Sequence, residues 1–125
     1  LALAHALALS FTEVNAVHDQ YLHGEMVAMG TIAQLAMEQS ADARRAAIFF
    51  AKVGLPIHLG QLSLSPKNHR ELDVISAAAE ARPIAHNMPM AVTQSSIKRA
   101  LLDAHELGLE IAQTLGDSAY RRLQP

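Results

Sequence analysis

Histidine is the residue type that this sequence uses most unusually. Seven histidines occur in 125 residues, beside three Phe, two Tyr and neither Trp nor Cys. His5 stands alone in an apolar run, and His23 precedes Gly24 at the expected start of a long helix. A helix N-terminus favours the neutral imidazole, which is the form that binds metal ions. Both rings are therefore candidate metal ligands; the alternative for His5 is an ordinary core histidine with hydrogen-bond partners.

A metal ion shared by His5 and His23 would require the chain to turn back between them. Eighteen residues of straight helix would separate the two by about 27 Å, whereas zinc holds histidine nitrogens at about 2.0–2.1 Å. A break at residues 10–13 and a turn at residues 19–23 would allow the reversal.

Two ligands are too few for zinc, which needs three or four. The carboxylates nearest in sequence belong to Glu13, Asp19 and Glu25, and none has motif-like spacing to both histidines. We therefore expect the third ligand to lie outside this segment.

Four other histidines have simpler interpretations. His58, His69 and His105 lie in expected loops or beside charged residues, and His18 precedes an acidic residue in an expected turn. We predict that all four are ordinary surface or capping residues.

Composition and motifs argue against several classes of function. Ten Lys and Arg against twelve Asp and Glu give a net charge of −2, so no basic excess favours nucleic acid. No apolar run reaches the roughly 20 residues of a membrane span, and the absence of Cys fits a reducing, cytoplasmic location. Neither a glycine-rich phosphate loop nor a GxSxG elbow occurs.

The spacing of apolar residues, caps and helix breakers predicts an all-α fold in one domain. We expect residues 55–64 to form an extended connection or a short strand, and residues 84–92 a loop. Phe49 and Val53 should face inward. The expected helices are Leu1–Leu9, a short one from a capping box at Ser10 to about His18, Glu25–Gln39, Ala41–Val53, one from the Ser65-Pro66 start to about Arg82, and Gln94–Leu115.

The chain opens inside an apolar, helix-favouring run without Met or a capping residue. We therefore expect residues 1–125 to be a single, partial domain of a longer protein. The apolar faces of the first helix and of Glu25–Gln39 would then lack partners, and a large exposed apolar surface favours self-association. This predicts a homo-oligomer.

Several motifs resemble one enzyme family. Residues 23–35 read HGEMVAMGTIAQL, which resembles the HGExVAxGTxxQL signature of glycerol dehydrogenases, in the iron-containing (metal-dependent, group III) alcohol dehydrogenase superfamily. Residues 54–62 (GLPIHLGQL) and 86–89 (HNMP) continue the match, and His5-Ala6 stands where the family has the first histidine of an HAxHNG segment. Order and spacing agree over essentially all 125 residues.

The resemblance implies a C-terminal, all-helical metal-binding domain of the dehydroquinate synthase-like fold, following an N-terminal nucleotide-binding domain. It implies that His5 and His23 are two metal ligands, that an Asp further upstream is the third, and that this segment adds no other catalytic residue. Zinc, or another divalent metal such as iron, would ease deprotonation of a substrate hydroxyl. Hydride would pass to NAD on the other domain, converting glycerol to dihydroxyacetone. This segment alone should be inactive.

The sequence departs from the family pattern beside the first histidine. Ala8, Leu9 and Ser10 replace the second His and the Asn-Gly of HAxHNG, Met26 replaces a basic residue, and Met90-Ala91 replaces a Gly-Gly pair. A polyol or hydroxy acid other than glycerol is therefore an alternative small-molecule substrate.

Two further interpretations stay open. The altered first-histidine segment is compatible with a non-catalytic helical remnant that binds a metal or a partner. A sugar-phosphate enzyme or a dehydroquinate synthase-like lyase would need several convergent cations. Arg44, Arg45 and Lys52 lie on a different helix from the candidate histidines, which disfavours that interpretation.

Overall fold

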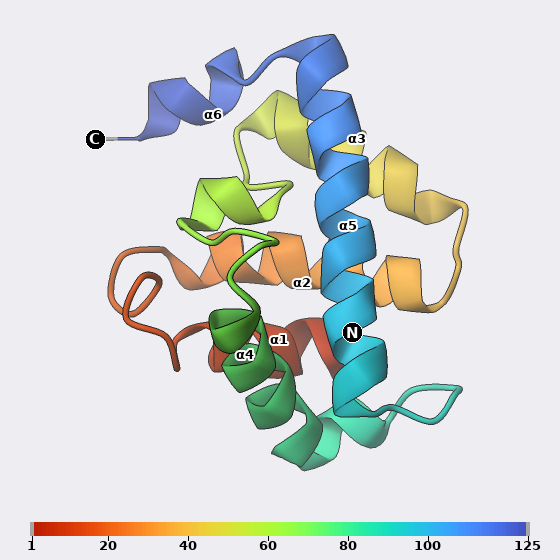
Figure 1. The fold of residues 1–125 in the computed structure, drawn as a ribbon. Helices are drawn as coiled ribbons and strands as arrows, with labels where there is room; N and C mark the ends of the chain where they lie inside the picture. Colours follow the sequence, from red (N-terminus) through yellow and green to blue (C-terminus); the bar gives the residue numbers. More distant parts are fainter. Residues whose placement is uncertain (1, 125) are drawn as a thin grey trace.

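The computed structural model describes residues 2–124, which form a bundle of helices without a strand (Figure 1). This confirms the predicted all-α fold. No helix in this range is both long and apolar enough to cross a bilayer. With η marking a 3-10 helix, the elements are α1 (Ala2–Phe11), α2 (His23–Met37), α3 (Asp42–Val53), η1 (Leu59–Leu62), α4 (His69–Ala81), η2 (Pro83–His86), α5 (Gln94–Leu115) and α6 (Ser118–Leu123).

The contact between α1 and α2 is a close backbone approach. A Cβ on Gly30 would come within 2.7 Å of the carbonyl oxygen of Ala4, so only glycine allows this crossing. The N–H of Ala4, which has no partner within its own first turn, donates to Oε1 of Gln34 at 3.1 Å. Since helix N–H groups point toward the N-terminus and carbonyls toward the C-terminus, α1 and α2 run in opposite directions across this contact.

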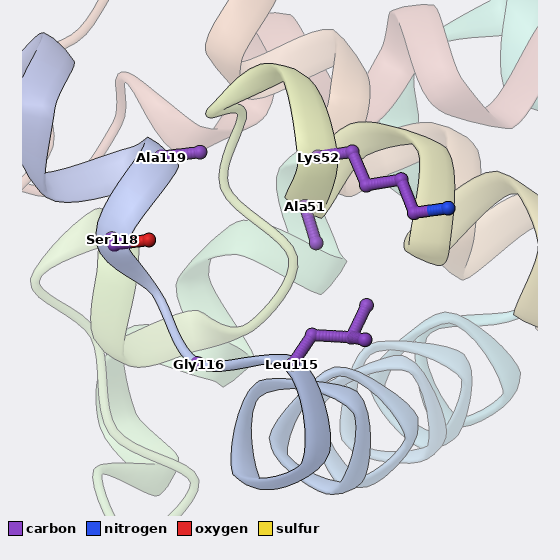
Figure 2. Close-up of a pocket in the computed structure, with 6 residues that line it drawn as sticks. All are labelled: Ala51, Lys52, Leu115, Gly116, Ser118 and Ala119. Carbon is purple, nitrogen blue, oxygen red and sulfur yellow. The ribbon is translucent and has the colours of Figure 1, made fainter.

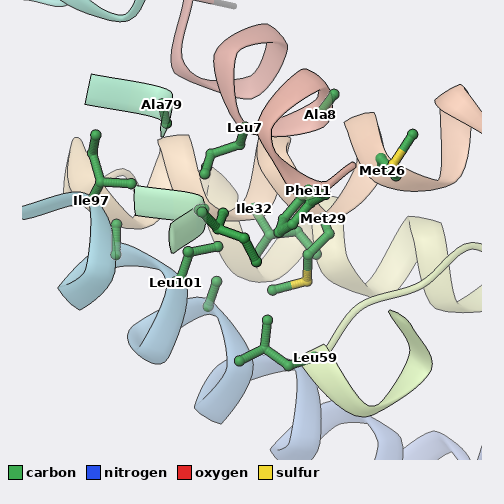
Figure 3. Packing of buried hydrophobic residues seen from close by; sticks show 14 of the residues in the cluster. Leu7, Ala8, Phe11, Met26, Met29, Ile32, Leu59, Ala79, Ile97 and Leu101 are labelled. Atoms are coloured by element: carbon green, nitrogen blue, oxygen red, sulfur yellow. The ribbon is translucent and has the colours of Figure 1, made fainter. Parts of the chain in front are cut away.

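The core is one apolar cluster to which all five longer helices contribute. Fully buried side chains from α1, α2, α4 and α5 meet in its centre, and Leu59 of η1 closes one side (Figure 3). Most apolar side chains of α1 and α2 are therefore covered within the chain, and Leu9 is the large apolar residue of these two helices that stays exposed, at 45%. Fully buried residues of the cluster include Leu3, Leu7, Phe11, Met29, Ile32, Leu72, Ile75, Ile97 and Leu101.

Two side chains of α3 face solvent instead of the core. Phe49 is 59% exposed and Val53 is 45% exposed, so the prediction that they face inward is wrong. Only the small residues Ala43 and Ala47 of this helix are buried. Phe49 and Val53 therefore lie away from the side on which α3 packs, whereas Ile48 and Phe50 are partly buried against the core.

Ser10 does not begin a helix, contrary to the sequence-based prediction. It lies in the last turn of α1, where its hydroxyl donates to the carbonyl of Ala6 at 2.7 Å and accepts from Nε of Arg82 at 3.0 Å. Residues 12–20 form turns, not the short helix expected to reach His18. The capping box was misassigned because Ser10 bonds backward along α1 and across to the end of α4.

The start of α4 also differs from the prediction. Asn68 is the N-cap, because its Oδ1 accepts the N–H of Glu71 at 3.2 Å while its Nδ2 donates to the Glu71 carboxylate at 2.7 Å. The hydroxyl of Ser65 accepts from the N–H of Lys67 at 3.2 Å in the preceding turn. Pro66 therefore lies outside the helix.

Replacing Asn68 with alanine tests this assignment. We expect Asn68→Ala to lower the free energy of unfolding by about 1 kcal/mol, since that is typical for loss of a helix N-cap. Ser65→Ala should lower it by less than about half of that. Urea unfolding measures both variants, and an equal or larger effect at Ser65 would contradict the assignment.

The helices with strong local signals lie where the sequence predicted them. Thr93 and Ser96 form a reciprocal capping box at the start of α5, with N–H to hydroxyl distances of 3.1 and 2.9 Å. Gly54 and Gly116, with φ of 89° and 76°, follow the last residues of α3 and α5. The extended connection contains the 3-10 helix η1, and α6 was not predicted at all.

Candidate metal site and a second histidine pair

His23 is the first residue of α2, and it is exposed. The helix begins there because the carboxylate of Glu25 accepts the N–H of Leu22 at 2.8 Å, which satisfies one backbone group before the first turn. Residues 23, 27, 30 and 34 share one face of α2 by their helical spacing. Gly30 and Gln34 contact α1, so His23 lies on the side of α2 that faces α1, about 10 Å along the axis from Gly30.

His5 directly follows Ala4, the residue of α1 that contacts Gly30. It is exposed although most of α1 is buried. Because the two helices run in opposite directions, the step from Ala4 to His5 leads toward the end of α2 that carries His23. The chain reversal that a shared ion requires is therefore present, and the binding of one ion by both rings stays a prediction.

The three nearby carboxylates have other roles. Glu13 lies 3.8 Å from the guanidinium of Arg82, Asp19 lies 3.1 Å from Nε2 of His18, and Glu25 caps α2. Among residues 2–124, no three His, Cys, Asp or Glu side chains are grouped so that they could hold a metal ion. A complete shell around His5 and His23 would need a ligand from beyond these residues.

Of the three replacements in the first-histidine segment, only Leu9 shares the surface of His5. Ala8 and Ser10 are fully buried, whereas Leu9 is 45% exposed. Leu9 lies four residues after His5 and therefore one turn along the same face of α1. An apolar side chain thus borders His5.

Two of the clefts among the described residues are lined in part by α6. The larger, about 450 Å³, adjoins the first turn of α2, since Tyr21, Leu22 and Glu25 line it together with Leu55 and Leu123. The smaller, about 220 Å³, lies between the ends of α3 and α5 and the start of α6 (Figure 2). Its lining residues are Ala51, Lys52, Leu115, Gly116, Ser118 and Ala119.

A second pair of histidines was missed, and the prediction that His58 and His105 are surface residues is wrong. His105 is only 4% exposed, and its Nδ1 accepts the N–H of Leu59 at 3.0 Å. The half-buried His58 ring lies edge-on to it, with ring centroids 5.8 Å apart. Nδ1 of His58 has no hydrogen-bond partner among the described residues. His18 and His69 are exposed, as predicted.

Burial lowers the pKa of both rings, and a charge on His105 would lower the pKa of His58 further.

The sequence contained a helical signal that His105 is buried. It lies four residues after Leu101 and three before Gly108, both buried, so the pattern places all three on one face of α5.

The arrangement of helices defines a class of protein. The structure of glycerol dehydrogenase from Schizosaccharomyces pombe matches it with a TM-score of 0.82 and 30% identity, over 100% of this chain and 33% of that chain. A probable glycerol dehydrogenase from Sinorhizobium meliloti matches with a TM-score of 0.79 and 29% identity, over 86% of this chain and 31% of that one. The bundle is the helical part of a glycerol dehydrogenase-type fold.

Sequence relatives agree with this class. Glycerol dehydrogenase of Citrobacter freundii is 38% identical over 112 residues, which cover 86% of this chain and 30% of that protein. Glycolaldehyde reductase of Halobacterium salinarum is 38% identical over 115 residues, covering 89% and 31%. No family model matches the chain. The chain is a glycerol dehydrogenase-like, C-terminal segment that spans about 30% of the length of these relatives.

Proposed function

We propose that this chain is the metal-binding part of an NAD-dependent dehydrogenase that oxidises a secondary hydroxyl of a small polyol to a ketone, with glycerol giving dihydroxyacetone. The observation that carries the proposal is the placement of His5 and His23. Both are exposed, and they lie on two antiparallel helices that cross at Ala4 and Gly30. The likeness to glycerol dehydrogenases supports the same reaction class.

The donor set suits a divalent transition metal, because imidazole nitrogen is a ligand for zinc and for iron. His5 and His23 would hold the ion together with a ligand from outside residues 2–124. A bound metal would supply Lewis-acid polarisation of the substrate hydroxyl. The 125 residues contain no glycine-rich phosphate loop, so NAD would be held by another part of the protein.

The chain's own contribution is a rigid support for the two rings. Gln34 holds the N-terminal turn of α1 through Ala4, and Arg82 bonds Ser10 in its last turn. His5 is therefore carried on a helix fixed at both ends. Leu9 would form an apolar wall beside it, which leaves a polyol or hydroxy acid other than glycerol as an alternative substrate.

A cytoplasmic homo-oligomer is part of this proposal. Support for self-association comes from large exposed apolar side chains, among them Leu22 at 74% and Leu123 at 65% exposure. No nucleic acid or membrane partner is proposed.

The direct test is an assay of the full-length protein that carries this chain. We expect reduction of NAD with glycerol or a related polyol, loss of that activity after chelation, and its return on addition of zinc. The panel should include reduction of glycolaldehyde, because one relative bears that name. Metal binding without turnover of any polyol, hydroxy acid or hydroxyaldehyde would favour the non-catalytic remnant instead.

A further inference from the structure

We propose that His58 and His105 form an acid-sensitive clamp that fastens the segment of residues 57–64, here called the η1 segment, to α5. The clamp is separate from His5 and His23 and does not depend on the proposed function.

The η1 segment lies directly on α5. A Cβ on Gly108 would come within 1.7 Å of the carbonyl oxygen of Ile57, so the two backbones touch there. One helical turn earlier, Nδ1 of His105 accepts the N–H of Leu59 at 3.0 Å. The contact therefore combines a backbone approach that requires glycine with a buried hydrogen bond.

That hydrogen bond requires a neutral ring. An imidazole nitrogen that accepts a hydrogen bond carries no proton, so the proton of His105 is on Nε2. Protonation would place an N–H on Nδ1 opposite the N–H of Leu59. The acceptor would be lost, and a buried donor would be left without a partner.

His58 makes protonation still less favourable. Its ring lies 5.8 Å from that of His105, and two positive charges in a partly buried site repel each other. The η1 helix has no charged residue. Asp117, which precedes α6, raises the pKa of His58, and Glu106 raises that of His105, but burial is the largest effect at both rings and lowers their pKa values.

The direction of the pH dependence follows from these shifts. In the folded chain, the pKa of each ring is below the ordinary value of 6.5. Once the η1 segment has moved away from α5, both rings would titrate near that ordinary value. The clamp is therefore fully stable above about pH 6.5 and loses stability as the pH falls toward the lowered pKa values. Each proton taken up on opening raises the opening equilibrium about tenfold per pH unit.

Opening would release more than one contact. The carbonyl of Gln61 accepts the hydroxyl of Tyr120 at 2.7 Å, which ties the η1 segment to α6. The hydroxyls of Ser63 and Tyr21 lie 2.5 Å apart, which ties it to the turn before α2. Loss of the clamp should loosen α6 and the cleft lined by Tyr21 and Leu22.

Hydrogen exchange at the Leu59 amide tests the clamp. After correction for the intrinsic exchange rate, we expect its protection in the 125-residue chain to fall as the pH drops below about 6.5, by up to about tenfold per pH unit for each proton taken up. In His105→Asn, the amide oxygen can still accept the Leu59 N–H but cannot ionise, so protection should fall less steeply with pH, because only His58 still titrates. His69→Asn removes an exposed histidine and should behave as the unmodified chain does.

Protection that is independent of pH in the unmodified chain, or that falls equally in His105→Asn, would overturn the proposal. If His105→Asn fails to fold, His58→Asn replaces it as the test. This variant removes one of the two titrating groups. The slope of the logarithm of protection against pH should therefore decrease by up to about one, which corresponds to one proton. An unchanged slope would show that the two rings do not act as a pair.

Discussion

His23→Ala should lower the zinc affinity of the full-length protein by more than about 100-fold and abolish its polyol oxidation, and His5→Ala should do the same. Loss of even a hydrogen-bond partner behind a metal ligand lowers affinity by about 10–100-fold, and loss of a ligand itself should exceed that. Metal content after dialysis and the rate of NAD reduction with added zinc measure the two effects.

The fold should tolerate both substitutions. His5 and His23 are exposed, so the thermal midpoints of the metal-free variants should stay close to that of the metal-free unmodified protein. His69→Ala is the matched control, because His69 is also exposed and is also the first residue of a helix. Retention of metal and activity in either ligand variant would remove that residue from the proposed site.

Gly108→Ala should lower the free energy of unfolding by about 3 kcal/mol or more, the upper part of the range for overpacking in a core. The new Cβ would meet the carbonyl oxygen of Ile57 at 1.7 Å. That atom belongs to backbone and cannot rotate away, so α5 and the η1 segment would have to separate. Chemical denaturation of the chain measures the loss.

Two other glycines calibrate this result. Gly30→Ala should also destabilise the chain, but less, because its Cβ would meet the carbonyl oxygen of Ala4 at 2.7 Å. Gly24→Ala meets nothing within 4 Å and should be neutral or stabilising by up to about 1 kcal/mol, since alanine favours a helix over glycine. A Gly108→Ala variant as stable as Gly24→Ala would mean that α5 does not lie against Ile57 as described.

The sequence predicted those elements whose ends are determined locally. The bounds of α5 follow from the capping residue Thr93 and from Gly116, and the end of α3 follows from Gly54. The predicted start of α4 was wrong because Ser65 and Asn68 are both suitable N-cap residues. Only the folded chain shows that Ser65 bonds within a turn while Asn68 bonds the helix.

The candidate site was predictable only in part. His5 and His23 were predicted as metal ligands from a motif and from their setting, and that assignment stays a prediction. The crossing of α1 and α2 through Gly30 could not be inferred from helix patterns. His105 was misread because Asp103 and Glu106 flank it, which suggested a surface position. Its spacing to Leu101 placed it inward, and the acceptor role toward Leu59 depends on a contact between residues far apart in sequence.

Anomalous diffraction at the zinc edge, from crystals of the zinc-loaded full-length protein, is the most direct test of the proposed metal site. We predict one peak at about 2.0–2.1 Å from a ring nitrogen of His5 and from a ring nitrogen of His23, with a further ligand from outside the 125 residues. Two rings in separate surroundings, with no peak between them, would contradict the assignment of this chain as the metal-binding part of a dehydrogenase.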